Sequence, residues 1–341
     1  MVSDKAVTTA STAQTLPLPS HAWTLDYLRL RLIATLVRLP VQLALGVSPY
    51  LLHTDNYLRG KGVTRKRILV PSRQKGRSIK VDVYQPESFT ATEGGAWQAA
   101  TKPVHINWHG SGFVLPCLGG DVDFCTYMVQ KLQITILDAD YRKAPENPFP
   151  AAIEDAEDVA LWTLAQKQSW DTSKLSLSGF SAGANLALST SWQLGPERVL
   201  AVATLYPVTD FVNHGGPKTP PKASKGALAL PRVVSRFFDQ SYLVINSNRK
   251  DPRLSPLYAE PQRYPRSVYI ACGQGDTLHD DGKLLIEKLQ KEDHADAKFV
   301  SLPGMGHGFD KARSGPAVDV ARQTYLEFAN RIQASWTLAK L

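Results

Sequence analysis

The sequence predicts an α/β protein built on a mostly parallel sheet of eight strands flanked by helices. Short β-type runs alternate with stretches of helical period along most of the chain, and strands separated by helices are typical of a parallel sheet with crossover connections. The chain has 341 residues, of which 43% are hydrophobic and 21% charged. This length and composition suit one large core with an added lid.

Eight runs have the length and composition of strands, and the first two leave no room for a helix between them, so we expect them to form an antiparallel edge. The predicted strands cover residues 65–72, 78–86, 103–110, 134–141, 174–179, 200–207, 267–274 and 297–304. Apolar residues at helical spacing predict helices between the later strands and after the last one. These helices are expected over residues 122–132, 151–167, 182–193, 282–291 and 317–335.

Two regions fall outside this alternation and are expected to form a lid. The sheet core is predicted over residues 63–210 and 263–341. Residues 1–62 are predicted to be an N-terminal extension with lid helices, and residues 211–262 a lid insert. The front of the insert is rich in Gly, Pro and Lys, and we expect a loop there that leads into a short helix near 232–243.

The N-terminal region contains an amphipathic helix whose apolar face is formed by leucines at helical spacing, namely Leu25, Leu28, Leu32, Leu36 and Leu39. Arg31 and Arg38 share another face. Together with Arg29 and Pro40 they interrupt the apolar stretch, which argues against a membrane span. We expect this helix to pack on the protein itself. The alternative is peripheral contact with a membrane surface.

The positive charge of the chain is concentrated in one segment. The formal net charge is +8, and between Phe211 and Arg266 ten Lys or Arg residues stand against three acidic ones. No DNA- or RNA-binding motif accompanies this charge, so we expect no nucleic-acid partner. The insert, with Lys218, Lys222 and Lys225 in one loop, is expected to be either a solvated face or an attractor of an anionic substrate.

Cysteine usage and the chain ends bear on the compartment. The three cysteines make no disulfide framework, there is no Asn-x-Ser/Thr sequence, and the first twenty residues lack the pattern of a signal peptide. These features favour a reducing, non-secreted setting. The last residues, Ala339-Lys340-Leu341, are a conservative variant of the Ser-Lys-Leu peroxisomal signal. They predict import into peroxisomes through the import receptor. If the tail is a chance sequence, the expected location is cytoplasmic.

The stretch Gly179-Phe180-Ser181-Ala182-Gly183 matches G-x-S-x-G between a predicted strand and a predicted helix. The two glycines would let the chain turn sharply and lift the Ser181 hydroxyl above the carboxyl edge of the sheet. A Gly-rich joint with an incidental serine is the alternative. In this context we interpret Ser181 as a nucleophile.

A serine nucleophile needs a base, and in a sheet of this kind the histidine follows the serine and the acid along the chain. His307 is the predicted base because its glycine-rich loop, directly after the last strand, can fold back over the sheet edge. The other histidines after Ser181 are His214 in the insert loop, His279 beside the acid candidates and His294 at a solvated helix end.

The orienting acid is expected after the penultimate strand, where "ACGQGDTLHDDG" offers three aspartates. Asp276 comes first and is the predicted acid. Asp280 and Asp281 come later, and we interpret them as the N-cap and first turn of the next helix.

Backbone N–H groups are expected to bind an oxyanion. Ser111 and Gly112 lie in the Gly-rich turn "HGSGF" after a predicted strand, and Ala182 follows the nucleophile. We predict that the N–H groups of these three residues form the oxyanion hole and that His109 holds the loop.

The motifs "HGSGF", "DYRKAPENPFPAA", "GFSAG", "GQGDTLHDDG" and "GMGHGF" occur in order over about residues 65–335. Together they resemble the hormone-sensitive-lipase-like branch of the α/β hydrolases, with fungal-type variants. The resemblance implies hydrolysis of carboxylic esters, no cofactor or metal, and a lid built from the N-terminus and the insert. It also implies structural roles for Tyr141, Arg142, Pro145 and Glu146.

The chain departs from the family pattern at two positions. Ser111 replaces the middle of three glycines, which would cost strain if that position needs a positive φ. Phe180 stands before the nucleophile, where the family usually has an acidic residue. The second departure puts in doubt any polar contact made there.

The implied activity is that of a serine hydrolase that works through an acyl-enzyme on a small or medium acyl ester. Fungal relatives often serve specialised-metabolite pathways, which extends the expectation to such a substrate. An acyl-CoA thioesterase or acyltransferase would use the same three residues, and a lyase reaction is a further alternative. A non-catalytic ligand receptor would be expected to lack one of them. The chain is expected to be a monomer or a homodimer.

Overall fold

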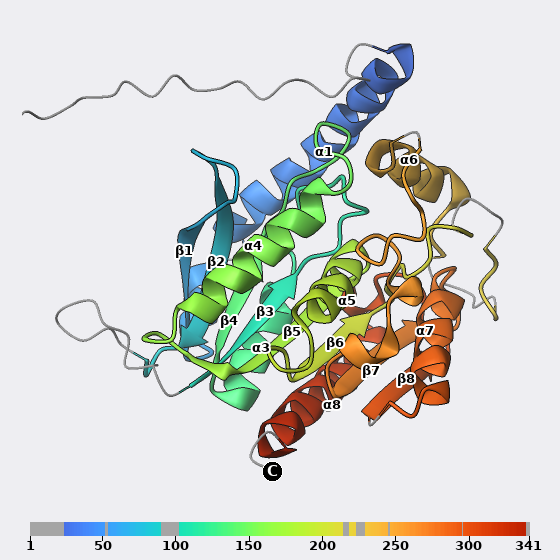
Figure 1. Cartoon of the computed structure of the whole chain (residues 1–341). Helices are drawn as coiled ribbons and strands as arrows, with labels where there is room; N and C mark the ends of the chain where they lie inside the picture. Colours follow the sequence, from blue (N-terminus) through green and yellow to red (C-terminus); the bar gives the residue numbers. More distant parts are fainter. Residues whose placement is uncertain are drawn as a thin grey trace, which may run out of the picture.

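The computed structural model describes residues 24–51, 54–89, 102–213, 218–222, 229–244, 246–294 and 296–338. Several features named above lie outside the described residues, namely the first twenty residues, His214, Lys225 and Ala339-Lys340-Leu341. The described part forms a central sheet with helices on both faces (Figure 1), which confirms the predicted fold class.

The eight strands lie in the order β1-β2-β4-β3-β5-β6-β7-β8. The first pair is antiparallel, as predicted. β2 also runs antiparallel to β4, and the other neighbours are parallel. All eight predicted strands are present, as β1 Val63–Pro71, β2 Ser78–Pro86, β3 Pro103–Trp108, β4 Thr135–Ala139, β5 Asp171–Phe180, β6 Ala201–Leu205, β7 Ser267–Gly273 and β8 Asp296–Leu302.

The direction of winding reverses beside β3. The connection after β3 leads to β4 on one side, whereas β5 lies on the other side and the later strands continue away from it. In an open parallel sheet, the loops at such a switch point separate and leave a crevice at the carboxyl edge. The turns after β3 and β5 carry "HGSGF" and "GFSAG", so the topology brings these two motifs to one crevice.

The helices cover both faces of the sheet. α4, α5 and α7 bury one face with a core that includes Ile106 and Leu177, and α3 and α8 bury the other with a core that includes Phe124 and Phe328. The helices are α1 Leu25–Leu51, α2 Thr54–Arg59, α3 Val122–Leu132, α4 Ala151–Ala165, α5 Ala182–Leu194, α6 Arg232–Tyr242, α7 His279–Lys291 and α8 Pro316–Leu338, with 3₁₀ turns at Pro256–Tyr258, Pro261–Arg263 and Phe309–Lys311.

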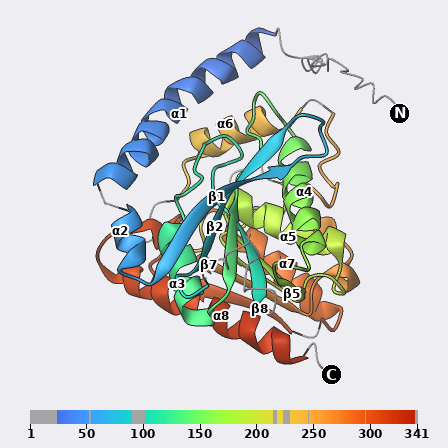
Figure 2. The same cartoon turned by 90° about the vertical axis from the view of Figure 1, so that its left-hand side faces the viewer.

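Helix α1 packs on the protein, but not through the leucine face. Tyr27, Leu30 and Ala34 are buried, whereas the leucines that define the apolar face in the sequence are exposed. Arg38 is responsible for part of this orientation, because its guanidinium forms a bidentate pair with Glu146 and donates to the carbonyl of Ala144. The helix lies at the periphery of the molecule (Figure 2). Among the described helices, none is both long and apolar enough to cross a membrane.

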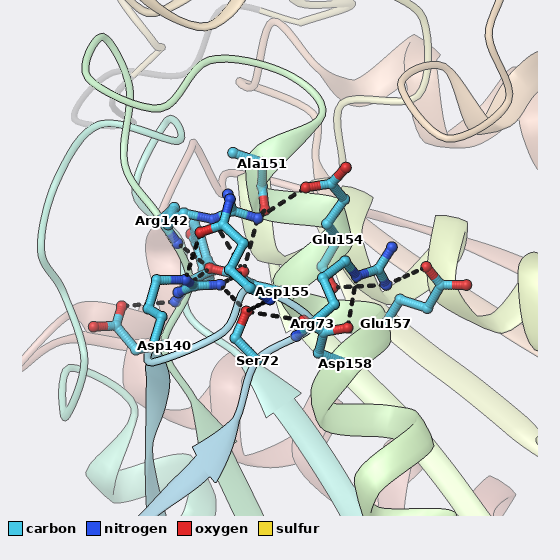
Figure 3. A network of polar contacts seen from close by, with 12 residues as sticks. Ser72, Arg73, Asp140, Arg142, Ala151, Glu154, Asp155, Glu157 and Asp158 are labelled. Atoms are coloured by element: carbon cyan, nitrogen blue, oxygen red, sulfur yellow. Dashed lines mark hydrogen bonds and ion pairs between the residues drawn. The ribbon is translucent and has the colours of Figure 1, made fainter. Parts of the chain in front are cut away.

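A network of ion pairs fastens α4 to the β1–β2 hairpin and to the segment after β4 (Figure 3). The Asp155 carboxylate is fully buried and accepts from the backbone N–H of Arg142 at 2.9 Å and from its Nε at 3.0 Å. The guanidinium of Arg77 pairs with the same carboxylate. Arg73 pairs with Asp158 at 2.7 Å. These contacts fix α4 against both segments.

We expect Asp155→Ala to lower the free energy of unfolding by about 3–5 kcal/mol, because it removes the fully buried carboxylate that Arg77 and Arg142 share and leaves Arg142 only the partly exposed Glu154. Urea unfolding measures this change. Glu157→Ala is the matched control. Glu157 pairs with the partly exposed Arg73, and its loss should cost less than about 1 kcal/mol. Equal effects of the two substitutions would contradict the role given to Asp155.

Candidate active site

The nucleophile turn is built on two close backbone contacts. Ser181 lies between β5 and α5 with a φ of +51°, which is strained for a residue with a side chain. A Cβ on Gly179 would lie 2.2 Å from the carbonyl oxygen of Gly183, and one on Gly183 would lie 2.0 Å from that of Trp108. Only glycine fits at these positions. The two glycines therefore allow the sharp turn at Ser181, as the sequence predicts.

The structure brings the three predicted catalytic residues together at the carboxyl edge. His307 Nε2 lies 3.1 Å from Ser181 Oγ, and His307 Nδ1 lies 2.8 Å from Asp276 Oδ2. Asp276 follows β7 and is completely buried, and its other oxygen accepts from the N–H of Leu278 at 2.9 Å. His307 follows β8. The geometry is that of a serine whose proton an oriented imidazole can accept.

His279 and His105 have structural partners of their own. His294, expected at a solvated helix end, follows α7 and is partly buried. His279 begins α7 and lies 2.8 Å from the hydroxyl of Ser301 on β8. Asp280 and Asp281 occupy the first turn of α7, as expected, although the N-cap itself is Leu278. His105 is fully buried between Ser176 and Ser178, and burial lowers its pKa to about 3. The neutral His105 ring bridges β3 and β5 and has no access to the crevice.

The loop after β3 is held by one phenol. The Tyr141 hydroxyl donates to the carbonyl of His109 at 2.7 Å and lies 2.6 Å from Ser111 Oγ, and the His109 ring stacks on the Tyr141 ring at 4.7 Å. A positive φ occurs at Gly112 and Phe113 but not at Ser111. Ser111 is therefore tolerated without strain, and its hydroxyl adds a contact that glycine could not make. These contacts fit the structural roles expected of Tyr141 and His109.

The residue before Ser181 is aromatic, and a lysine ammonium lies against its ring. Phe180 is buried edge-on against Phe124, and Lys311 Nζ lies 4.1 Å from the centre of the Phe180 ring. Lys311 also pairs with Asp121 and Asp310. Burial alone would lower the pKa of Lys311, but the two carboxylates outweigh burial and raise it well above its usual value. At the sequence position where the family usually has an acidic residue, this chain thus has an aromatic ring that lies against a cation.

Tyr206 and Asp310 are neighbours of the site that none of the sequence motifs predicted. The Tyr206 ring lies 4.7 Å from the His307 ring, and its hydroxyl donates to Asp310. Tyr325 donates to the other oxygen of Asp310 at 3.1 Å. Asp310 is three residues after His307, and this short spacing was the signal in the sequence. Tyr206 lies at the end of β6, where only the sheet order places it beside the histidine.

Electrostatics favour a protonated imidazole. Burial alone would lower the pKa of His307, but the Asp276 carboxylate, with a smaller contribution from Asp310, outweighs burial and raises the pKa above its usual 6.5. An imidazolium formed by proton transfer from Ser181 is thereby stabilised. The base is also protonated, and so inactive, at a higher pH than an isolated histidine would be.

Ser181 and His307 line a cavity of about 1360 Å³. Both regions expected to form the lid contribute to it, α1 through Val41 and Gln42, and the insert through Leu230, Val234 and Phe238. The loop after β3 and the edge strands complete the wall. Lys218 of the insert does not line this cavity. Its ammonium pairs with Asp281 in the first turn of α7. Within the described residues no group of His, Cys, Asp and Glu is arranged to hold a metal ion.

The fold and the site define a hydrolase of the serine-nucleophile type. The profile of the family described as alpha/beta hydrolase fold matches residues 105–311, and the chain belongs to this family. The expected resemblance to its hormone-sensitive-lipase-like esterases is thereby confirmed. Both bacterial and fungal esterases are among the similar proteins.

Similar proteins occur in bacteria, fungi and archaea. An ethyl acetate hydrolase of Pseudomonas putida is 27% identical over 76% of this chain and 79% of its own length. A versiconal hemiacetal acetate esterase of Aspergillus parasiticus is 29% identical over 65% of this chain and 75% of its own length. The solved structure of a hyperthermophilic esterase from the archaeon Pyrobaculum calidifontis has a TM-score of 0.71 at 24% identity, and covers 94% of this chain and 99% of that one.

We expect Asp310→Asn to move the acid limb of the kcat/KM profile to lower pH, because it removes one of the charges that raise the pKa of His307. Asp276→Asn should move it in the same direction and also reduce kcat by about 10³–10⁴. The measurement is kcat/KM against pH with a soluble ester. The exposed Asp319→Asn is the control with the same loss of charge. An acid limb that stays in place in Asp310→Asn would rule out the contribution of Asp310.

Proposed function

We propose that the protein is a carboxylesterase that cleaves its substrate through an acyl-enzyme on Ser181. The observation that carries this proposal is the continuous hydrogen-bonded contact from Ser181 to His307 to Asp276 at the floor of a large cavity. The named esterases among the similar proteins support the same reaction class. A ligand receptor on the same scaffold would not need these contacts, and their presence favours catalysis.

In the first half of the reaction, Ser181 Oγ attacks the acyl carbon while His307 Nε2 accepts its proton. The buried Asp276 carboxylate holds the ring by Nδ1 and stabilises the imidazolium. The backbone N–H groups of Ser111, Gly112 and Ala182 are proposed to bind the oxyanion, with Ala182 at the first position of α5. His307 then gives its proton to the leaving alcohol.

In the second half, a water replaces the alcohol. His307 takes a proton from this water, whose oxygen attacks the acyl-enzyme, and the collapse of the second tetrahedral intermediate returns the proton to Ser181 Oγ. The same N–H groups bind the second oxyanion. All steps are proton transfers and acyl transfers that these side chains can perform, and no cofactor enters them.

The proposed substrate is an ester with a small or medium acyl group. The cavity exceeds the size of most small-molecule sites, which leaves room for a bulky alcohol part. The similar fungal protein is named for a hemiacetal acetate, which supports an acetate of a specialised metabolite as one candidate. The acyl-CoA alternative would need cations directed at the substrate, and the pairing of Lys218 with Asp281 reduces what the insert offers.

A fluorophosphonate probe should label the wild-type protein once and should not label Ser181→Ala. The same substitution should reduce hydrolysis of p-nitrophenyl esters by about 10⁴-fold or more, because the nucleophile is lost. Esters of graded chain length, assayed beside acyl-CoAs of equal chain length, identify the acyl preference. Persistent labelling of Ser181→Ala would refute the assignment, and turnover of acyl-CoAs alone would replace the esterase by a thioesterase.

The tail Ala339-Lys340-Leu341 is proposed as a peroxisomal address. A fluorescent protein that carries residues 332–341 should collect in peroxisomes, as judged by overlap with a peroxisomal marker. Deletion of Leu341 should make the signal diffuse. A diffuse signal with the complete tail would leave the cytoplasm as the proposed location.

A further inference from the structure

Helix α1 presents a ridge of leucines to solvent. The exposed fractions of Leu25, Leu32 and Leu36 are 87%, 61% and 63%. The leucine ridge consists of Leu25, Leu28, Leu32, Leu36, Leu39 and Leu43. Successive members are three or four residues apart, so the ridge runs straight along one side of the helix for about 27 Å.

The residues that the structure describes do not cover this ridge. The buried side of α1 carries Tyr27, Leu30 and Ala34, and at about 100° per residue these side chains point away from the ridge. The helix is therefore apolar on two opposite sides, of which one packs on the protein and the other is exposed. Large apolar side chains gathered on one exposed surface are typical of a site of contact.

A groove with three arginines lies beside the ridge. It has a volume of about 470 Å³ and separates α1 from α6. Its apolar residues include Leu30, Ile33 and Phe237, and the cations are Arg29, Arg232 and Arg236. In the described part of the chain, none of these three guanidinium groups forms an ion pair or a side-chain hydrogen bond. The groove thus combines apolar surface with positive charge that the fold leaves available.

We propose that the leucine ridge and this groove dock the protein on a phospholipid bilayer that contains anionic headgroups. The leucines would enter the boundary between headgroups and acyl chains, and the three arginines would bind phosphate and carboxylate groups of the lipids. Pairing of the ridge with that of a second copy would bring two sets of arginines toward one interface, and such a contact is disfavoured by like charge. An anionic bilayer complements both features.

The helix that carries the docking surface also forms part of the wall of the cavity at Ser181. Val41 and Gln42 belong to the same helix and line that cavity. The bilayer would then lie against the helix that forms one of the cavity walls. The docking surface does not include the catalytic residues, so it can be tested separately from the proposed esterase activity.

The test is flotation of the full chain with vesicles of phosphatidylcholine alone and of equimolar phosphatidylcholine and phosphatidylserine. We expect binding to the mixed vesicles that weakens with salt. Leu32→Ser/Leu36→Ser should reduce partitioning about tenfold or more, through the loss of apolar insertion. Arg29→Gln/Arg232→Gln/Arg236→Gln should reduce it about a hundredfold, since each cation near an anionic surface contributes about fivefold.

Matched controls use exposed residues elsewhere, Leu284→Ser for the ridge and Lys283→Gln/Lys291→Gln/Arg322→Gln for the groove. They should bind vesicles like the wild type. All variants should keep the wild-type activity on a soluble ester, which verifies their folding. Absence of vesicle binding by the wild type would overturn the proposal. Two other results would also overturn it. One is a wild-type dimer that binds no vesicles and becomes monomeric in the leucine variant. The other is a groove that binds inorganic phosphate in a protein that binds no vesicles.

Discussion

The close backbone packing around Ser181 is the constraint on which the site depends. Gly179 and Gly183 approach each other and Trp108 so closely that no side chain fits between them. This packing holds Ser181 at a positive φ that the residue would not adopt alone. It also places the start of α5 beside the turn after β3, so the nucleophile and the N–H groups proposed for the oxyanion share one crevice.

Around this fixed point, several buried carboxylates are paired with a basic side chain. Asp276 is fully buried and contacts His307, Asp155 is fully buried between two arginines, and the buried Asp121 pairs with Lys311. A buried charge without a partner would be costly, so each pair also fixes the distance between two segments of chain. The pairs hold the loops of the carboxyl edge in place without filling the cavity. Part of the cavity wall comes from α1 and the insert, which lie outside the sheet.

Much of the site could be predicted from the sequence, because its residues lie in short motifs at the ends of strands. A strand, a glycine turn and a helix are local features, and parallel strands carry their following loops to the same edge. Ser181, His307 and Asp276 follow from this rule. Tyr206 does not, because its position beside His307 arises from the order of the strands. The exposed face of α1 was also unpredictable, since its two sides are both apolar and the Arg38–Glu146 pair, between residues far apart in the chain, helps to orient it.

The alternation of strands and helices, the glycines of the turn at Ser181 and the order of the catalytic candidates could all be predicted from the sequence. Each of them depends on residues that are neighbours along the chain. The surroundings of these residues could not be predicted in the same way, because they are formed by segments that are far apart in the sequence. The Lys311 ammonium lies against the Phe180 ring. Ser111 is unstrained because the positive φ falls on Gly112, and the leucines of α1 face outward. These outcomes depend on contacts between distant segments, and such contacts are settled by packing and charge pairing over the whole molecule.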